Sequence, residues 1–200
     1  MTSPLKLKVV LGSTRNGRQG DAVSSWVLRG AVDHGAFDVE LLDLRTYRLP
    51  MFGESDSRSG AMDAFNAAIA DGAAFVFVTP EYNHSVPAVL KNAIDSVFGA
   101  LRNKPAGFVG YSAGLVGGAR AVEHLAQIVI EAEMVPLRNA VLVGQAHQAF
   151  ADGQPNDPVR DGALDILLDD LAWWGDALRR ARSAGELPPA SARRTRQVAA

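Results

Sequence analysis

The chain has 200 residues, of which 48% are hydrophobic and 21% are charged, a length and composition typical of one folded domain. Twenty basic and twenty-two acidic residues give a net charge of -2, which argues against a nucleic-acid partner bound through bulk charge. There are no cysteines, so disulfides, thiolate metal sites and thiol relays are excluded. Any redox chemistry must therefore come from a bound cofactor.

The chain shows no signal for membrane association. No apolar run approaches the roughly 20 residues that span a bilayer, and residues 1–8 lack a long apolar segment behind a basic stretch. We therefore expect a cytoplasmic protein with no membrane partner.

Strand-like and helix-like segments alternate along the chain. Short apolar runs predict buried strands at Leu5–Leu11, Phe37–Leu44, Ala73–Thr79, Gly107–Tyr111 and Val135–Val143. Helical periodicity predicts helices at Asp21–Val32, Met62–Asp71, Pro87–Leu101, Ala119–Ala132 and Arg160–Arg182. This alternation predicts a flavodoxin-like, three-layer α/β fold, a doubly wound sheet of five parallel strands in the order 2-1-3-4-5.

One domain is expected to end near Arg182. The last stretch, Ser183–Ala200, contains Pro188 and Pro189 and several arginines but has no apolar period, which indicates a disordered tail more than a basic docking arm. Trp173 and Trp174 on the last predicted helix are expected to anchor the core or an interface.

In a doubly wound sheet the ligand binds beyond the carboxyl ends of the strands, where the strand order reverses. The first loop of interest runs from Gly12 to Gly20 and leads into a helix. A helix start offers unpaired N–H groups and a positive dipole end, and arginines add forked donors. We therefore expect a phosphate here, bound by the hydroxyls of Ser13 and Thr14 and by the guanidinium groups of Arg15 and Arg18.

Two common phosphate motifs fit this loop poorly. The triphosphatase pattern requires lysine and a hydroxyl residue where this chain has Arg18 and Gln19. The dinucleotide pattern fails because the glycines fall at 12, 17 and 20, although Asp43 could imitate its ribose-binding acid. A glycine-rich turn with an exposed arginine and no ligand remains the simplest alternative.

The loop after the third strand is stiffened by Pro80 and Pro87. Its amides and side chains can be held ready for the carbonyls and ring nitrogens of a planar heterocycle. The residues expected to contact such a ring are Pro80, Glu81, Tyr82 and Asn83.

The loop after the fourth strand is rich in glycine and also leads into a helix. Its amides could donate to a flavin carbonyl that gains negative charge on reduction. The expected binding residues are Ser112, Gly114, Gly117 and Gly118. The four histidines form no helical ligand pair, so no metal site is expected.

Taken in order, these segments resemble the NAD(P)H-dependent FMN reductase family. The resemblance covers about Lys8 to Gly144 and is carried by Gly12-Ser13-Thr14-Arg15, by Pro80 to Pro87 with the helix Leu90–Asp95, and by Gly117-Gly118-Ala119-Arg120. It implies FMN as the cofactor, NADPH or NADH as the hydride donor, a small-molecule electron acceptor, and a homodimer or homotetramer. It implies FMN phosphate at Ser13, Arg15, Arg18 and Gln19, with the flavin ring against Pro80–Asn83 and the Ser112–Gly118 loop. It implies no catalytic acid or base.

Three rival functions are considered beside an oxidoreductase. A flavodoxin-like electron carrier would bind FMN without oxidising a nicotinamide, and its usual strong surface acidity is not evident here. A flavin-supplying partner of a monooxygenase would release FMN instead of retaining it. A third option is an FMN-binding scaffold that docks a partner through its arginine-bearing tail.

Overall fold

The computed structural model describes residues 3–54, 60–97, 99–189 and 192–193. A parallel sheet forms its centre, with strands β1 (Leu5–Leu11), β2 (Phe37–Asp43), β3 (Ala74–Pro80) and β4 (Pro105–Tyr111). The strand order is β2-β1-β3-β4-β5, and every pairing within this sheet is parallel. The predicted fold class and order are confirmed.

The fifth position of the sheet is divided between two short strands instead of the predicted run Val135–Val143. β5 (Val135–Pro136) pairs with the start of β4, and β6 (Val141–Val143) pairs with its end. Pro136 has no N–H to extend the ladder, and Leu137 turns into the core, where it is buried. The edge strand is therefore interrupted, while both segments keep the same parallel direction.

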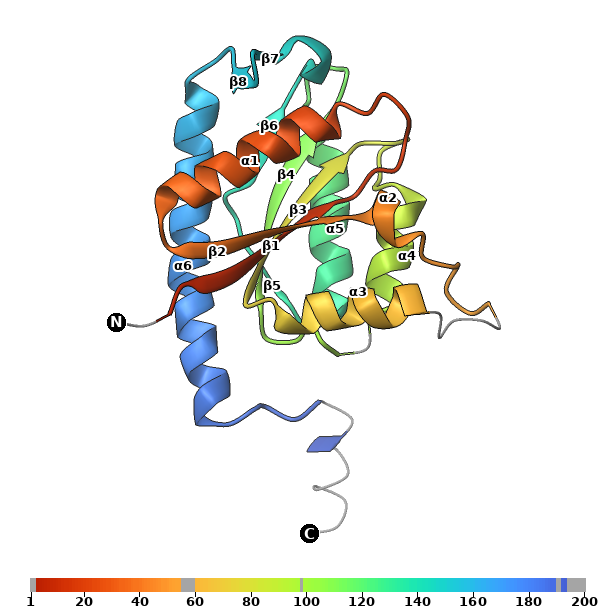
Figure 1. The fold of residues 1–200 in the computed structure, drawn as a ribbon, viewed down its shortest axis with the longest axis vertical. Coiled ribbons are helices and arrows are strands. Elements are labelled where there is room, and N and C mark those ends of the chain that lie inside the picture. Colours follow the sequence, from red (N-terminus) through yellow and green to blue (C-terminus); the bar gives the residue numbers. More distant parts are fainter. Residues whose placement is uncertain (1–2, 55–59, 98, 190–191, 194–200) are drawn as a thin grey trace.

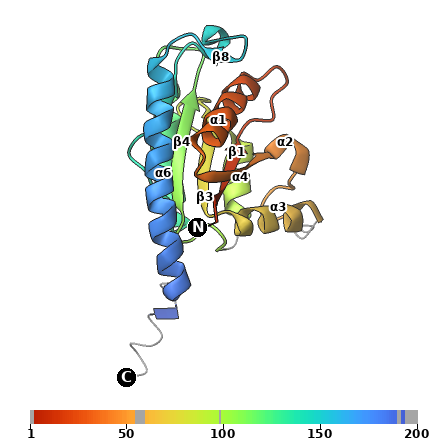
Figure 2. The ribbon, with the colours of Figure 1, turned by 60° about the vertical axis from the view of Figure 1, so that its left-hand side comes forward.

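Helices cover both faces of the sheet. On one face lie α1 (Gly20–His34) and α6 (Val159–Ala184), and on the other lie α3 (Gly60–Asp71), α4 (Ala88–Asp95) and α5 (Ala119–Glu131). Figure 1 shows these layers, and the rotation in Figure 2 separates α6 from α3 and α4 on opposite sides of the strands. Each face buries its own hydrophobic cluster, and a row of Phe75, Phe77 and Phe108 fills the side covered by α3, α4 and α5.

The helix bounds differ from the sequence expectation mainly at two ends. α4 stops at Asp95 instead of Leu101, and Ser96 caps it by donating from its hydroxyl to Asn92 O at 2.7 Å. α6 continues through Ser183 and Ala184, which the sequence assigned to the tail. The remaining part of the predicted tail lies largely outside the described residues, so its disorder stays a prediction.

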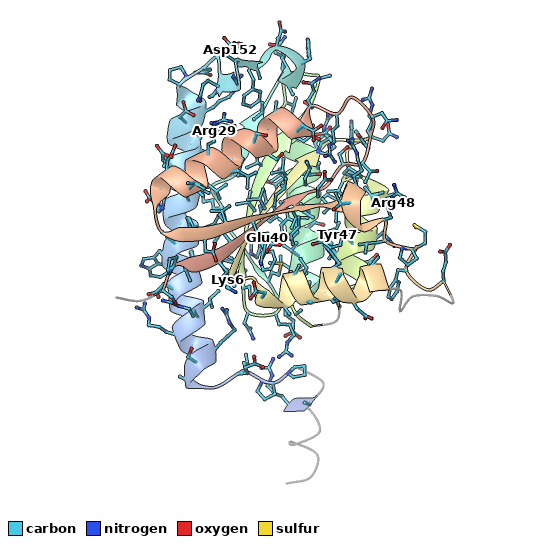
Figure 3. The ribbon with its side chains drawn as sticks, viewed as in Figure 1. Lys6, Arg29, Glu40, Tyr47, Arg48 and Asp152 are labelled. Carbon is cyan, nitrogen blue, oxygen red and sulfur yellow. The ribbon has the colours of Figure 1, made fainter. Side chains whose placement is uncertain are left out.

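Several short elements were not predicted. They are α2 (Leu44–Tyr47), the 3-10 turn η1 (Ala146–Gln148), and a hairpin of β7 (Phe150–Ala151) and β8 (Gln154–Pro155). Asp152 and Gly153 both have positive φ at the hairpin turn, a conformation that Asp-Gly pairs favour. Figure 3 shows Arg29 of α1 near the hairpin that carries Asp152, and the Arg29 guanidinium donates to Gly153 O.

The amino-terminal end of the sheet contains two buried lysines that are fully engaged. Lys8 Nζ pairs with Glu40 and with Asp71, the latter at 2.9 Å. Lys104 Nζ donates to the carbonyls of Ile69 and Ala70 at 3.2 and 3.0 Å, at the end of α3. In Figure 3, Lys6 and Glu40 mark this lower part of the sheet.

Candidate functional site

Loops at the carboxyl end of the sheet surround a cavity of about 360 Å³. This size lies within the range that holds small-molecule ligands and cofactors. The loops that follow β1, β3 and β4 meet in the upper part of Figure 1. The cavity is lined by Arg15, Gly17, Arg18, Gln19, Pro80, Glu81, Tyr82, Tyr111, Ser112, Ala113, Ala146 and His147.

The first loop is held against the end of the sheet. Gly12 N donates to Val78 O at 2.9 Å, and the buried Ser13 hydroxyl lies 3.1 Å from Tyr82 Oη. α1 begins at Gly20 without a side-chain cap from Gln19. The N–H groups of the first turn therefore keep their capacity for an anion, and the helix dipole favours one.

Arg18 lies beneath this loop, with its side chain only 3% exposed. Its Nε donates to Asp21 and its Nη1 to Asp43, both at 2.8 Å, while Nη1 also donates to Ser13 O. Nη2 pairs with both carboxylates. Four guanidinium hydrogen bonds therefore go to groups of the protein itself. These contacts tie the first loop to α1 and to the end of β2.

This ion pair shifts the pKa of both partners. Hydrogen bonding to Asp43 raises the pKa of Arg18, although burial acts against it. Burial by itself raises the pKa of Asp43, but hydrogen bonds from Arg18 and from Arg45 N outweigh it, so that the pKa lies below its usual value. Asp43 therefore stays charged and holds the first loop through Arg18. The dinucleotide pattern had suggested a ribose-binding role for it instead.

Arg15 contrasts with Arg18. Its side chain is exposed at the cavity, and within the described residues its guanidinium has no hydrogen-bond or ion-pair partner. Its backbone is held in place, because Arg45 Nη2 donates to Arg15 O at 2.5 Å. Arg15 thus presents an uncommitted cation from a fixed backbone position.

The second loop turns back on itself immediately after β3. Tyr82 and Ser85 form an antiparallel bridge with N···O distances of 2.9 and 3.0 Å, and the two residues between them, Asn83 and His84, have positive φ. A two-residue turn of this kind fixes the position of Tyr82 at the cavity wall. Asn83 lies at the exposed tip of the turn and does not line the cavity.

Glu81 is the buried acid of this site, with its side chain 6% exposed. Oε1 forms an ion pair with Arg120 at the start of α5, and Arg120 Nη1 also lies 2.8 Å from His84 Nε2. Oε2 is buried and has no hydrogen-bond partner. A buried carboxylate oxygen without a donor is costly, so the site retains acceptor capacity at this position.

The third loop brings in a segment that the sequence did not single out. Ser112 N donates to Val143 O at 3.1 Å, and Ser112 O accepts from Ala146 N at 2.9 Å. These bonds place η1 beside the loop, so that Ala146 and His147 join the cavity wall. Their position just after the carboxyl end of β6 was the available signal, and it was missed because the final strand was not divided.

The glycines of the third loop shape the chain without lining the cavity. Gly117 and Gly118 have positive φ, and a Cβ on either would come within 2.9 Å of backbone atoms of β6 or β4. They allow the loop to pack on the sheet before α5 begins. A Cβ on Gly114 would meet open space, and Gly114 O accepts from the Ser112 hydroxyl at 3.0 Å.

Tyr111, at the end of β4, is 4% exposed, and its hydroxyl is buried without a hydrogen-bond partner. Burial raises its pKa, with Tyr82 acting in the same direction; the neighbouring Ser13 hydroxyl acts against the shift but is not within hydrogen-bonding geometry. A Cβ on Gly20 would lie 2.5 Å from Tyr111 Oη. Glycine at position 20 therefore lets this neutral donor lie against the first turn of α1.

Some of the predicted binding residues line the cavity, and others lie beneath or outside its wall. Those at the cavity wall are Arg15, Arg18, Gln19, Pro80, Glu81, Tyr82 and Ser112. Ser13 lies just beneath, in contact with Tyr82, whereas Asn83, Gly114, Gly117 and Gly118 lie outside the wall. Gly17, Tyr111, Ala113, Ala146 and His147 line the cavity without having been proposed as binding residues.

The donor set fits an anionic, planar ligand with polar edges. One end offers the free Arg15 cation and the uncapped start of α1, and the other offers aromatic and proline surfaces. Two buried polar atoms, Tyr111 Oη and Glu81 Oε2, lack a hydrogen-bond partner among the described residues. In the described residues no group of three or more His, Asp or Glu side chains could hold a metal ion, and no helix there is long and apolar enough to cross a membrane.

Comparison with known proteins decides among the ligands that such a site could hold. The family model for NADPH-dependent FMN reductases matches residues 5–148, which include all three loops. The chain belongs to this family. It is therefore an oxidoreductase that uses NAD(P)H and FMN, as the sequence predicted.

Similar proteins agree with this membership. The chain is 33% identical over 188 residues to an NAD(P)H-dependent FMN reductase of Pseudomonas aeruginosa, covering 90% of this chain and all of that protein. It is 31% identical to a 2-hydroxy-1,4-benzoquinone reductase of Burkholderia sp., covering 85% and 96% of the two chains. The flavoenzyme NAD(P)H:(acceptor) oxidoreductase FerB from Paracoccus denitrificans shares the fold, with a TM-score of 0.73, 24% identity, and 86% and 98% coverage.

Proposed function

We propose that this family member holds FMN in the cavity at the carboxyl end of the sheet and reduces a quinone-class acceptor with electrons from NAD(P)H. The observation that carries the site assignment is the pair of buried, unpartnered polar atoms, Tyr111 Oη and Glu81 Oε2, in the same cavity. Buried polar groups are normally hydrogen-bonded. A ligand with matching polar edges would supply both partners.

The phosphate of FMN would bind at the first loop. Arg15 would donate to phosphate oxygens, and the N–H groups at the start of α1 would add donors aligned with the helix dipole. Ser13 and Gln19 remain candidate contacts from the same loop. Arg18 would act as a positioning residue, because its donors are already committed to Asp21, Asp43 and Ser13 O.

The flavin ring of FMN would bind between the second and third loops. Pro80 and Tyr82 offer apolar and aromatic surface, and Ser112 lies on the opposite wall. Glu81 Oε2 would accept an N–H from the ring edge, while Arg120 holds Oε1. Asn83, Gly114, Gly117 and Gly118 would support these walls from outside.

Bound FMN supplies the redox chemistry, accepting hydride from a reduced nicotinamide and delivering electrons to a second acceptor. The contribution of the protein is positioning and electrostatic stabilisation. The buried, neutral Tyr111 hydroxyl can donate but does not ionise at ordinary pH, because its pKa is raised by burial. The ion pair with Arg120 keeps Glu81 oriented toward the cavity.

A quinone-class acceptor is favoured by the similar proteins. Besides the benzoquinone reductase, a quinone reductase of Escherichia coli is 29% identical over 190 residues and aligns over its full length. Free flavin and azo compounds are the competing acceptors. A supply of reduced flavin to a monooxygenase is the alternative role, and it requires FMN to leave the site readily.

The proposal is tested by anaerobic mixing of the FMN-loaded protein with NADH or NADPH, followed by quinone, azo dye, ferric and free-flavin acceptors in turn. We expect nicotinamide to bleach the flavin absorbance, and quinone to restore it faster than the other acceptors do. An unchanged flavin spectrum with both nicotinamides would contradict the proposal. Rapid loss of FMN on gel filtration would instead favour the flavin-supplying role.

The phosphate contact is tested by Arg15→Ala. Loss of a charge-assisted contact at this point should weaken FMN binding by roughly 10- to 100-fold, measured by calorimetry. The urea midpoint of the FMN-free protein should hardly change, because the guanidinium has no partner within the described structure. Equal FMN affinity in the two proteins would rule out the Arg15 role.

The oligomeric state and the cellular location of the protein are also proposals. We infer a homodimer or homotetramer from the family resemblance, and a cytoplasmic location from the composition of the chain. Equilibrium sedimentation and cell fractionation measure these directly.

A further inference from the structure

A second cavity, of about 250 Å³, lies beside the FMN cavity at the carboxyl end of the sheet. It is bounded by Thr14 of the first loop, by α2 and the segment that follows it, and by Val89 and Asn92 of α4. Thr14 is the direct neighbour of Arg15, which lines the FMN cavity, so one loop forms a wall of both cavities. A ligand bound in one of them can therefore extend into the other.

Most of the wall of this second cavity is apolar. Leu44, Leu49, Met51 and Val89 form the apolar part. The volume lies just below the range of cavities that hold a whole cofactor or drug-sized ligand. The cavity is thus sized for one flat, apolar-faced end of a larger ligand.

Two arginines, Arg45 and Arg48, also line this cavity, and none of the described residues in its wall is acidic. Arg48 is exposed, and within the described part of the chain its guanidinium forms no hydrogen bond or ion pair. Arg45 Nη2 donates to Arg15 O at 2.5 Å, but Arg45 Nε is buried and forms no hydrogen bond with the described residues. A buried N–H without an acceptor is costly. The cavity therefore combines an apolar wall with unused guanidinium donors.

The backbone that carries Arg48 is held on both sides. At the start of α2 the Asp43 carboxylate accepts from Arg45 N at 2.9 Å. Beyond Arg48, the buried Asn92 side chain on α4 donates to Pro50 O at 2.9 Å. Figure 3 shows Arg48 at the end of α2, on the side of the molecule away from α6. A cation on a fixed backbone favours binding, because less of the chain has to be ordered when the ligand arrives.

The nicotinamide donor carries a group that matches this cavity. The adenosine half of NADPH combines a flat base with a 2′-phosphate, and a phosphate monoester has close to two negative charges at neutral pH. Arginine accommodates this phosphate in other NADP-binding proteins, and its forked donors match the phosphate oxygens. NADH has a hydroxyl in the same place and offers no anion to either arginine.

We propose that Arg48, together with Arg45 Nε, is the specificity-determining contact for the 2′-phosphate of NADPH, with the adenine against the apolar wall of the second cavity. The nicotinamide end would lie on the flavin ring in the neighbouring cavity, so this inference rests on the proposed function. It adds a preference for NADPH over NADH, which the proposed function leaves open.

The first test compares the binding of adenosine 2′,5′-bisphosphate and of 5′-AMP to the FMN-loaded protein, by calorimetry at one salt concentration. These two nucleotides differ only in the 2′-phosphate. We expect the bisphosphate to bind roughly tenfold more tightly or better, as one charge-assisted contact allows. Arg48→Gln should remove most of this advantage. Equal affinities of the wild type for the two nucleotides, or an unchanged advantage in the variant, overturn the proposal.

The matched control is Arg138→Gln, which removes the same charge from an exposed position between β5 and β6, at the other edge of the sheet. This control should keep the full preference for the bisphosphate. An equal loss in both variants would trace the preference to net charge and overturn the proposal. Arg48→Gln should keep the urea midpoint and the FMN affinity of the wild type. A fall in FMN affinity would assign Arg48 to the phosphate of FMN instead, and that result also overturns the proposal.

A second measurement follows the choice of nicotinamide during turnover with a quinone acceptor. The ratio of kcat/KM for NADPH to that for NADH should fall roughly tenfold in Arg48→Gln, through a higher KM for NADPH. Arg48→Lys should recover part of the ratio, because it keeps the charge but loses the fork. An unchanged ratio in Arg48→Gln overturns the proposal.

Failure of this inference and failure of the proposed function give different results. If the proposed function is wrong, neither nicotinamide reduces the flavin of the wild type. The comparison of the two adenosine nucleotides can then be repeated with the FMN-free protein, where it still reports on Arg48 alone.

Discussion

Two buried lysines near the amino-terminal end of the sheet contrast with two buried polar atoms at its carboxyl end. At the amino-terminal end, Lys8 has two carboxylate partners and Lys104 Nζ donates to two carbonyls. At the carboxyl-terminal end, Tyr111 Oη and Glu81 Oε2 are buried and form no hydrogen bond with the described residues. The first arrangement completes the fold, whereas the second leaves capacity for a ligand.

The same contrast divides two arginines of one loop. Arg18 is buried, and its guanidinium forms four hydrogen bonds and two ion pairs within the protein. Arg15 is exposed at the cavity and has an anchored backbone but an unengaged guanidinium. A site of this kind needs both, because a free donor is useful to a ligand only when the loop that carries it is fixed.

The largest effect is expected from Arg18→Met, which removes the committed arginine. Asp43 would be left partly buried and without its cation, and the first loop would lose its attachment to β2. We expect a loss of about 3 kcal/mol in the free energy of unfolding, measured with urea in the absence of FMN. FMN affinity should fall as well.

The control for this change is Lys91→Met, which breaks an exposed ion pair with Asp95 on α4. Exposed pairs of this spacing contribute about 0.5 kcal/mol or less, so its stability should stay near that of the wild type. A loss below about 1 kcal/mol in Arg18→Met would show that the loop does not depend on this anchor.

Tyr111→Phe should produce the opposite pattern, with an effect on binding and little on folding. The hydroxyl forms no hydrogen bond with the residues that the structure describes, so its removal should leave the unfolding free energy unchanged or slightly higher. FMN affinity should fall roughly tenfold, which corresponds to about 1.4 kcal/mol.

Ser96→Ala provides the matched comparison for the tyrosine. Its hydroxyl is also buried but donates to Asn92 O at 2.7 Å. We expect this variant to lose about 1 kcal/mol of stability and to bind FMN normally. If Tyr111→Phe destabilised the protein as much as Ser96→Ala and kept its FMN affinity, the proposal that the Tyr111 hydroxyl binds FMN would be wrong.

The smallest effect is a pH dependence at the other end of the sheet. Burial lowers the pKa of Lys104 to about 8, with Arg182 adding to the shift, from an ordinary value of 10.5. Between these two values the unfolded chain binds more protons than the folded one, so this group makes stability rise with pH. The rise should be on the order of 1 kcal/mol.

The measurement compares urea midpoints at pH 7.5 and 9.5 for the wild type and for Lys104→Met. Other titrating groups act equally in both proteins, so the difference between the two slopes belongs to Lys104. Identical slopes would mean that this lysine keeps its ordinary pKa in the folded protein.

Local sequence patterns were enough to predict the fold. Short β-branched and aromatic runs alternating with helical periodicity predict parallel strands, because each such run must bury both faces under helices. The fold places the carboxyl ends of β1, β3 and β4 together, so the three ligand loops could be named in advance. The errors arose where local pattern was ambiguous, as in the divided final strand and the Asp152-Gly153 hairpin turn.

What the sequence by itself determined is therefore the order of the elements, the type of sheet, and the three loops that meet at its rim. Only the tertiary structure decided the use of the individual side chains. Arg18 and Asp43 are 25 residues apart, yet their pairing engages the Arg18 guanidinium within the protein. Likewise, Tyr111 Oη has no partner and Trp173 faces outward only because of what the rest of the chain leaves around them. Hydrogen-bond satisfaction and burial depend on neighbours distant in sequence, and no local pattern encodes them.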